Sequence, residues 1–166
     1  MVKKISNQVL NVLVILVAAC VVFVLVGAAC GVKPYVVMSG SMEPKIQTGS
    51  ICFINENVAY DRIKENDVIA FQTSAGAMVT HRVIGITEEG FETKGDNNDV
   101  SDGVSTTEAN YCGKNVFHVP YVGYGVQYLK TTRGKIIGIT VLVCLVIASF
   151  MTYSKDETKT ADEELE

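Results

Sequence analysis

The hydrophobic positions of this chain form two long runs, one near each end, with a strand-like polar segment between them. The twenty residues from Val12 to Gly31 contain no charge, and a second charge-free run of eighteen residues extends from Ile136 to Tyr153. Because roughly 20 apolar residues in a helix cross the hydrocarbon core of a bilayer, we predict transmembrane helices over residues 9–31 and 135–153.

Charges near the first run predict its orientation. Lys3 and Lys4 precede it, which favours a cytoplasmic terminus over residues 1–8. Two crossings would then return an acidic tail, residues 154–166, to the cytoplasm and leave residues 32–134 outside. Three basic residues next to the second run oppose the usual charge bias: Lys130, Arg133 and Lys135. The alternative for the first run is a cleaved signal peptide, whose apolar core is usually shorter.

Short apolar or β-branched runs separated by turn residues fill the segment from 32 to 134, where no amphipathic helix of ordinary length is evident. These runs predict strands over residues 35–38, 50–54, 68–71, 78–86, 91–94 and 114–119. We therefore predict a mainly β fold, an antiparallel and partly barrel-like sheet flanked by the two transmembrane helices.

The charge balance and the cysteines narrow the possible partners. The net charge of −4 comes from the last twelve residues, which hold six acids and two lysines. The balanced remainder offers no basic surface for nucleic acid. Only Cys52 and Cys112, of five cysteines, lie in the polar segment, and their pairing stays open. With two histidines and no C-x-x-C motif, we expect no metal and no cofactor.

Three polar clusters interrupt the predicted strands. Residues 39–44, Ser-Gly-Ser-Met-Glu-Pro, would expose hydroxyls in a turn after an extended run. His81 lies inside the long strand predicted over 78–86, and residues 94–102 form a loop rich in Asp and Asn. Taken singly, these are more often a plain turn, a core histidine and a solvated loop, and the loop lacks the spacing of an EF-hand.

Together the clusters supply a nucleophile, a base and an orienting carboxylate. A serine hydroxyl becomes a good nucleophile when a neutral imidazole takes its proton, while a carboxylate fixes the tautomer of that imidazole. The chain order here is Ser, His, Asp. This order differs from those of chymotrypsin, subtilisin and the α/β-hydrolases, and no G-x-S-x-G elbow is present. The triad would therefore occupy another scaffold.

The three clusters and Asp67-Val68-Ile69-Ala70-Phe71 resemble the successive motifs of type I signal peptidases. Their order and approximate spacing agree over residues 33–130. Each motif is weak alone, but the combination is specific. Many bacterial members have a lysine base where this chain has His81. The chain thus resembles the Ser-His branch, which includes endoplasmic-reticulum, archaeal and sporulation-associated enzymes.

This resemblance implies roles for particular residues. Ser41 matches the nucleophile, His81 the general base and Asp102 the carboxylate that orients the histidine. Asp96 matches another acid that is important in the family. Asp99 is a nearby competitor that spacing does not exclude, so the choice among the three acids stays open.

The resemblance also implies an oxyanion and substrate-binding turn. The hydroxyl of Ser39 and the backbone N–H of Ser41 would stabilise the oxyanion, with Gly40 and Met42 in the same turn. We expect the substrate to pair with residues 35–38, and pockets for small side chains to be lined by apolar strand residues: Val37, Ile54 and Ile69. Ten residues from Gly31 to Ser41 span at most about 33–36 Å, which tethers the nucleophile near the bilayer.

The function implied is a membrane-bound serine endopeptidase that removes signal peptides from exported preproteins through an acyl-enzyme. Its partners would be signal peptides, the lipid bilayer and the secretion translocon. The location would be the cell membrane, with the catalytic domain outside, or the endoplasmic reticulum membrane in a eukaryote.

Three alternatives remain. One is a paralogue that processes a few surface or spore proteins, and another is a non-catalytic peptide-binding adaptor. The third is a lysine base, although none of the available lysines occupies the lysine motif of the family: Lys33, Lys45, Lys64, Lys94 and Lys114.

Overall fold

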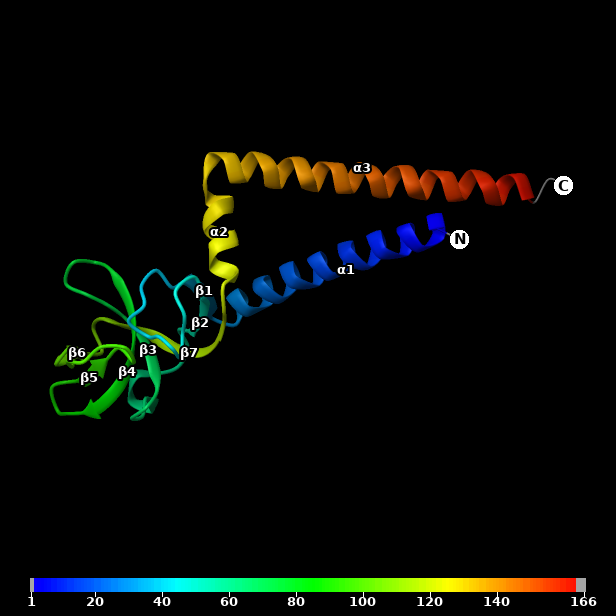
Figure 1. Cartoon of the computed structure of the whole chain (residues 1–166). Coiled ribbons are helices and arrows are strands. Elements are labelled where there is room, and N and C mark those ends of the chain that lie inside the picture. The colour runs from blue at the N-terminus through cyan, green and yellow to red at the C-terminus, as the bar shows by residue number, and fades with distance from the viewer. Residues whose placement is uncertain (1, 164–166) are drawn as a thin grey trace. The chain divides into compact units, whose positions relative to one another are not determined.

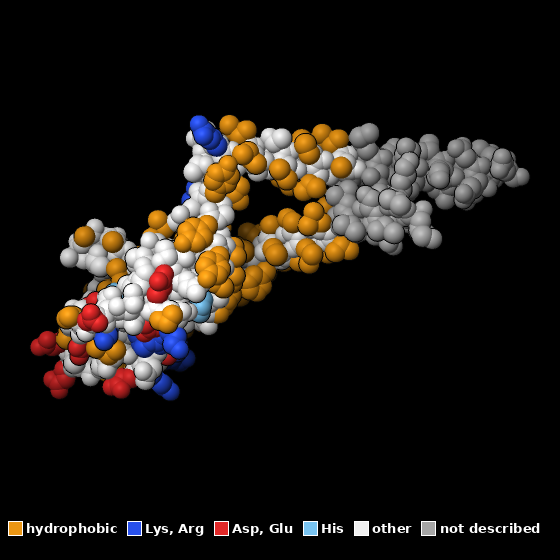
Figure 2. All heavy atoms as spheres, in the orientation of Figure 1, with side chains coloured by type: hydrophobic (Ala, Val, Ile, Leu, Met, Phe, Trp, Pro, Cys, Tyr) orange, Lys and Arg blue, Asp and Glu red, His pale blue; other side chains and the backbone are white. Residues whose placement is uncertain are grey.

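A computed structural model describes residues 2–163, which divide into two units. Residues 26–127 form a β-rich unit that carries the sheet. Residues 2–25 and 128–163 form a helical unit that contains most of α1 (Val2–Ala29) and all of α3 (Thr132–Glu163). Figure 2 shows apolar side chains along the described parts of both helices, whereas charged side chains gather over the β-rich unit.

One helix in the described part of the chain is by itself long and apolar enough to cross a membrane. It is α1, through the 19 residues Asn11–Ala29. Helix α3 meets the same criterion only when it is counted with the short α2 (Val122–Lys130) as one broken span. The second predicted crossing is therefore not established. Helix α3 also continues to Glu163, past residue 153 where we expected it to end and into the tail.

The β-rich unit contains one antiparallel sheet, shown in Figure 1. Its spatial order is β1-β2-β7-β3-β4-β5-β6, so β1 and β6 form the edges. Pro34, which has no N–H to donate, is tolerated because its strand is an edge strand. A 3₁₀ turn at Tyr60–Arg62 follows β2. The strands are β1 (Val32–Val36), β2 (Ile51–Asn55), β3 (Val68–Gln72), β4 (Met78–Ile86), β5 (Phe91–Lys94), β6 (Val104–Thr106) and β7 (Tyr111–Val119).

Two apolar clusters hold this sheet, and β3 contributes to both. Ala70 packs in the cluster of Met42, Ile46, Cys52 and Ile54. Its neighbours Ile69 and Phe71 belong to the second cluster, with Ile63, Val83 and Phe91. Side chains alternate between the faces of a strand, so the clusters lie on opposite faces of β3. Burying each large aliphatic side chain contributes roughly 1.5–3 kcal/mol.

The sequence predictions of strands 68–71, 78–86 and 91–94 are confirmed closely. The strand predicted over 35–38 begins and ends earlier, at Val32–Val36, and β6 was not predicted because it has only three residues. Helix α2, which has nine residues, was not predicted, because we expected no amphipathic helix of ordinary length in residues 32–134. Its two glycines and two tyrosines are poor helix formers in isolation.

Helix α2 begins where buried Gly123 donates its N–H to the carbonyl of Gly49, at 2.8 Å. A Cβ at Gly123 would lie 2.6 Å from that oxygen. This tertiary contact with the turn before β2 thus fixes the start of α2, which the sequence pattern does not predict.

The close approach of β7 to β2 gives the first testable prediction. Gly113 has φ +149°, and a Cβ there would lie 2.6 Å from the carbonyl oxygen of Asn55. We expect Gly113→Ala to lower the free energy of unfolding by more than about 1 kcal/mol, measured by thermal denaturation of the purified chain. The matched control is Gly125→Ala in α2, where a Cβ meets nothing within 4 Å. This change should be neutral or stabilising, and equal effects of the two changes would contradict the strand packing.

Candidate active site

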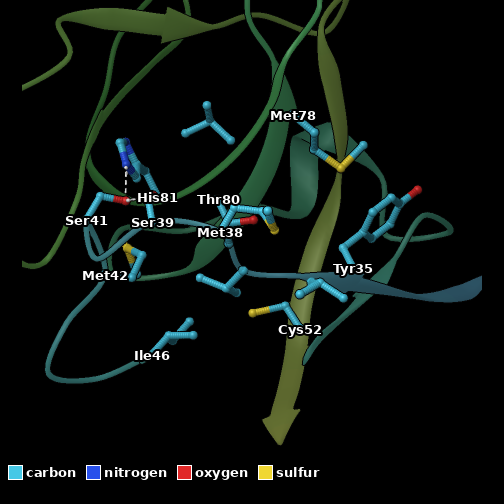
Figure 3. Close-up of a pocket in the computed structure, with 13 residues that line it drawn as sticks. Tyr35, Met38, Ser39, Ser41, Met42, Ile46, Cys52, Met78, Thr80 and His81 are labelled. Carbon is cyan, nitrogen blue, oxygen red and sulfur yellow. Dashed lines mark hydrogen bonds between the residues drawn. The ribbon is translucent and has the colours of Figure 1, made fainter. Parts of the chain in front are cut away.

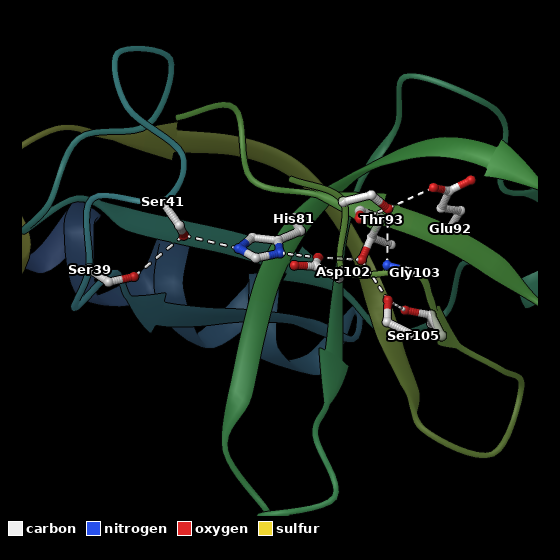
Figure 4. Close-up of polar contacts among 10 residues, drawn as sticks. Ser39, Ser41, His81, Glu92, Thr93, Asp102, Gly103 and Ser105 are labelled. Atoms are coloured by element: carbon white, nitrogen blue, oxygen red, sulfur yellow. Dashed lines mark hydrogen bonds and ion pairs between the residues drawn. The ribbon is translucent and has the colours of Figure 1, made fainter. Parts of the chain in front are cut away.

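Three side chains from separate parts of the sheet meet in a line, shown in Figure 4. Ser41 lies in the turn after β1, His81 in the middle of β4, and Asp102 in the loop between β5 and β6. The Nε2 atom of His81 is 3.0 Å from Oγ of Ser41, and its Nδ1 atom is 2.5 Å from Oδ2 of Asp102. Residues 40 and 21 positions apart in the chain thus form one continuous row of hydrogen bonds.

The carboxylate fixes the tautomer of this histidine. An ionised carboxylate only accepts hydrogen bonds, so Nδ1 of His81 carries the proton and donates it to Asp102. The neutral ring then has a bare Nε2, which accepts the hydroxyl proton of Ser41. The ring is 7% exposed and packs edge-on against Phe71, with 6.3 Å between ring centroids.

The structure distinguishes the three acids that the sequence left open. Asp102 is the one that contacts His81. Asp96 instead forms a two-pronged ion pair with Arg82, at 2.7 Å from Nε and 2.6 Å from an Nη nitrogen. Asp99 is exposed.

The Arg82–Asp96 ion pair ties the acidic loop to β4. Arg82 also donates to the backbone carbonyl of Asn66, at 2.8 Å. Its hydrogen bond to Asp96 raises the pKa of the guanidinium. Both side chains are partly buried, which makes a bidentate pair more favourable than an ordinary surface pair. One arginine therefore joins the strand that carries His81 to the start of the loop that carries Asp102.

The same loop also contacts the backbone of Ser41. The N–H of Asn97 donates to the carbonyl oxygen of Ser41 at 2.8 Å. Gly95 makes this approach possible, because a Cβ there would lie only 2.5 Å from that oxygen. The loop thus holds the backbone of the serine from one side.

Side chains within the turn hold Ser41 from the other side. Met42 is 2% exposed and is anchored in the core cluster with Ile46. Glu43 accepts from the hydroxyl and the N–H of Thr48, at 2.8 and 3.2 Å, and these hydrogen bonds lower the pKa of Glu43. Gly40 accepts from the N–H of Glu43 at 3.1 Å.

Ser39 lies beside Ser41 at the exposed end of the row. Their two Oγ atoms are 3.4 Å apart, beyond the usual range for O–H···O hydrogen bonds. Because the hydroxyl of Ser41 donates to His81, the hydroxyl of Ser39 keeps its proton available for another acceptor.

A mostly apolar cleft of about 390 Å³ opens beside the serine. In Figure 3, Ser41 and His81 lie at one end of it, and Tyr35 and Met78 lie at the other. Val37 lines the cleft as predicted, whereas Ile54 and Ile69 do not and are buried in the two core clusters. Met38, in the segment predicted to pair with the substrate, also lines the cleft, and further lining residues that the sequence did not indicate are Ile46, Cys52, Val79 and Thr80.

Two stretches of backbone lie beside this cleft, and each has one edge that pairs with no neighbouring strand among the described residues. Val37 exchanges hydrogen bonds with Ser50 and Gly49, on the β2 side. Since backbone groups alternate along an extended chain, those of Val36 and Met38 face away from β2. Across the cleft, residues 78–81 of β4 pair with β3, and the pairing of β4 with β5 begins only at Arg82.

A small polar group fixes Tyr35 at the far end of the cleft. Its hydroxyl donates to Glu56 at 3.1 Å, and Lys33 pairs with the same carboxylate at 2.7 Å. Burial, followed by the hydrogen bond to Glu56, raises the pKa of Tyr35, and that carboxylate also raises the pKa of Lys33. The ring is thereby held in a fixed position over the cleft.

Cys52 and Cys112, whose pairing the sequence left open, do not form a disulfide with each other. Both are free thiols. Burial raises the pKa of Cys52 to about 11, which makes this thiol on the cleft wall a poor nucleophile. Among residues 11–148, whose side chains the structure describes, no group of three His, Cys, Asp or Glu side chains is arranged to hold a metal ion.

Comparisons with known proteins agree on one family. A family model described as "Signal peptidase, peptidase S26" matches residues 9–117. Signal peptidase I W of Bacillus subtilis (strain 168) is 34% identical over 119 residues, which cover 65% of this chain and 63% of that protein. The signal peptidase complex catalytic subunit SEC11C of Homo sapiens is 34% identical over 110 residues, covering 60% and 56%.

The match covers a larger share of a fungal relative. The signal peptidase complex catalytic subunit SEC11 of Colletotrichum graminicola is 31% identical over 126 residues, which cover 65% of this chain and 73% of that protein. The chain thus spans somewhat less than two thirds of the bacterial and human relatives, at 63% and 56% of their lengths.

The Arg82–Asp96 pair gives a prediction that does not depend on activity. Arg82→Lys replaces a planar fork by a single ammonium, so at least one charged hydrogen bond is lost. We expect the free energy of unfolding to fall by about 1.5 kcal/mol and exchange of the Asn97 amide proton to accelerate, measured by denaturation and hydrogen exchange. Arg62→Lys, at an exposed position, is the control and should change neither. Unchanged exchange in Arg82→Lys would contradict the docking of the loop.

Proposed function

The chain belongs to the signal peptidase family, peptidase S26, and we propose on this basis that it is a membrane-bound serine endopeptidase that cleaves signal peptides from exported preproteins. One observation carries the proposal. A buried imidazole lies 3.0 Å from a serine hydroxyl on one side and 2.5 Å from a carboxylate on the other. These are the groups, in hydrogen-bonding range, that nucleophilic catalysis by serine needs.

In the first half of the reaction, Oγ of Ser41 attacks the scissile carbonyl carbon while Nε2 of His81 takes the hydroxyl proton. Asp102 stabilises the imidazolium that results. The backbone N–H of Ser41 and the hydroxyl of Ser39 donate to the oxyanion, and each such donor contributes roughly 3 kcal/mol to the transition state. His81 then passes its proton to the leaving amine, and an acyl-enzyme remains.

In the second half, His81 removes a proton from water, which attacks the acyl carbonyl. Collapse of the tetrahedral intermediate breaks the bond to Ser41, and the serine recovers its proton from His81. Asp96 acts indirectly in this scheme, because it fixes the loop through Arg82 rather than contacting the histidine.

The substrate would bind as an extended strand in the cleft. The outward-facing backbone groups of Val36 and Met38, and the unpaired side of residues 78–81, offer hydrogen bonds to a peptide inserted between them. The apolar floor, which includes Ile46 and Cys52, suits small uncharged side chains next to the scissile bond. This is the preference that the family implies for the residues one and three positions before the cut.

The long helices would hold the enzyme at the membrane. Helix α1 is the first crossing, and α3 is proposed as the second, with the β-rich unit outside the cytoplasm. Helix α1 ends at Ala29, and the twelve residues from there to Ser41 reach at most about 43 Å. The nucleophile therefore stays near the bilayer surface, where the cleavage site of a membrane-inserted signal peptide emerges. Access through a secretion translocon fits the same position.

Two other roles are compatible with the family. An enzyme dedicated to a few surface or spore proteins would use the same site, and a comparison of the proteins exported with and without this chain separates it from a general enzyme. A peptide-binding adaptor would need the cleft but not the row of hydrogen bonds, so the intact row favours an enzyme.

The proposal is tested by cleavage of a purified preprotein by the full chain in liposomes. We expect Ser41→Ala and His81→Ala to abolish processing, a loss of at least ~10⁴-fold, and Asp102→Asn to lose about 10⁴-fold because the tautomer is no longer fixed. Ser39→Ala should lose ~10²–10³-fold.

Matched controls come from the same residue types. His118→Ala and Asp99→Asn change the second histidine and an exposed acid of the same loop, and both should process at the wild-type rate. His81→Lys tests whether a lysine base suffices at this position. Wild-type processing by Ser41→Ala would refute the proposal.

A further inference from the structure

The carboxylate of Asp102 is held by a hydroxyl that the mechanism above does not use. The Oδ2 atom that contacts His81 also accepts a hydrogen bond from Oγ1 of Thr93, at 2.8 Å. Thr93 is fully buried in β5. Asp102, in contrast, lies in an exposed loop, and its side chain keeps 25% of its surface accessible. Without an anchor, a carboxylate in this position would rotate among several orientations.

The backbone brings the two residues together. The N–H of Asp102 donates to the carbonyl of Thr93 at 2.9 Å, and the N–H of Thr93 points to the carbonyl of Gly103 at 3.4 Å. On the neighbouring strand, Val83 is the partner of Thr93 and is fully buried. Because Thr is β-branched and packed, its χ1 angle is restricted, so the hydroxyl has a fixed direction.

A third hydroxyl extends the row. Oγ of Ser105, in β6, is 2.6 Å from Oγ1 of Thr93. Thr93 has one hydroxyl proton, and the carboxylate can only accept, so Thr93 donates to Asp102 and accepts from Ser105. Figure 4 shows the side chains of this row, from Ser105 and Thr93 through Asp102 to His81. Since a carboxylate only accepts, Thr93 on one side and His81 on the other both donate to Asp102.

We propose that Thr93 is a positioning residue of this site, supported by Ser105, which holds the Asp102 carboxylate in the orientation that fixes His81. The inference rests on the proposed function and assigns part of its catalytic efficiency to two hydroxyls that touch neither the substrate nor the reacting atoms. A buried threonine that served only for packing would have no need of its hydroxyl, and this difference makes the idea testable.

The test compares two replacements of Thr93 in the full chain, with kcat and KM for preprotein cleavage as the readout. Thr93→Val keeps the shape and removes the hydroxyl, and we expect kcat to fall about 10-fold or more while KM stays unchanged. Thr93→Ser keeps the hydroxyl and should stay within about threefold of wild type, because only the restraint of the branched side chain is lost. Thr87→Val removes a hydroxyl that bonds Gly90 in a distant hairpin and should leave kcat unchanged.

Wild-type kcat in Thr93→Val, or equal losses in Thr93→Val and Thr93→Ser, would overturn the inference. If Thr93→Val does not fold, Ser105→Ala decides, with an expected severalfold loss of kcat at constant KM, and an unchanged kcat would count against the row. Ser41→Ala separates the two levels of the argument. If that variant is inactive while Thr93→Val cleaves normally, only this inference fails, whereas activity in Ser41→Ala removes the proposed function itself.

Discussion

The direction of the protons on one imidazole is the constraint on which the site depends. His81 contacts a group that only accepts hydrogen bonds and a hydroxyl that can donate. The ring therefore presents its bare nitrogen to Ser41 only while Asp102 stays ionised and aligned with the opposite nitrogen. A rotated carboxylate would leave the ring free to adopt the other tautomer, in which Nε2 carries a proton and cannot accept one from serine.

The fold is arranged so that this alignment does not depend on a single contact. The turn of Ser41 is anchored by the side chain of Met42, which packs in the core, and by the N–H of Asn97, which donates to the carbonyl of Ser41. The loop of Asp102 is tied to β4 through Arg82 and Asp96, and to β5 through Thr93. The contacts through Asn97 and Arg82 join segments distant in sequence. A sheet whose two apolar clusters lie on opposite faces of β3 provides the rigid support.

Much of this site could be predicted from residue type and motif order. The motifs make Ser41 and His81 the candidate nucleophile and base, and the structure brings their side chains to within 3.0 Å. The turn residues and β-branched runs predict most of the sheet. The choice of Asp102 over Asp96 and Asp99 could not be made, because it depends on how a nine-residue loop is tied at its ends. The role proposed for Thr93 could not be predicted either, because Thr93 and Phe91 alternate in the sequence as ordinary inward-facing strand residues do. Helix α2 was missed because a tertiary contact at Gly123 starts it.

The most direct test of the central claim is nitrogen-15 NMR of the full chain, labelled at histidine, in detergent micelles near neutral pH. A His118→Gln variant removes the second of the two histidines and assigns the signals. The account predicts that neutral His81 carries its proton on Nδ1, with Nε2 unprotonated. A neutral ring with the proton on Nε2 would contradict it, because the nitrogen that faces Ser41 could then no longer accept the hydroxyl proton.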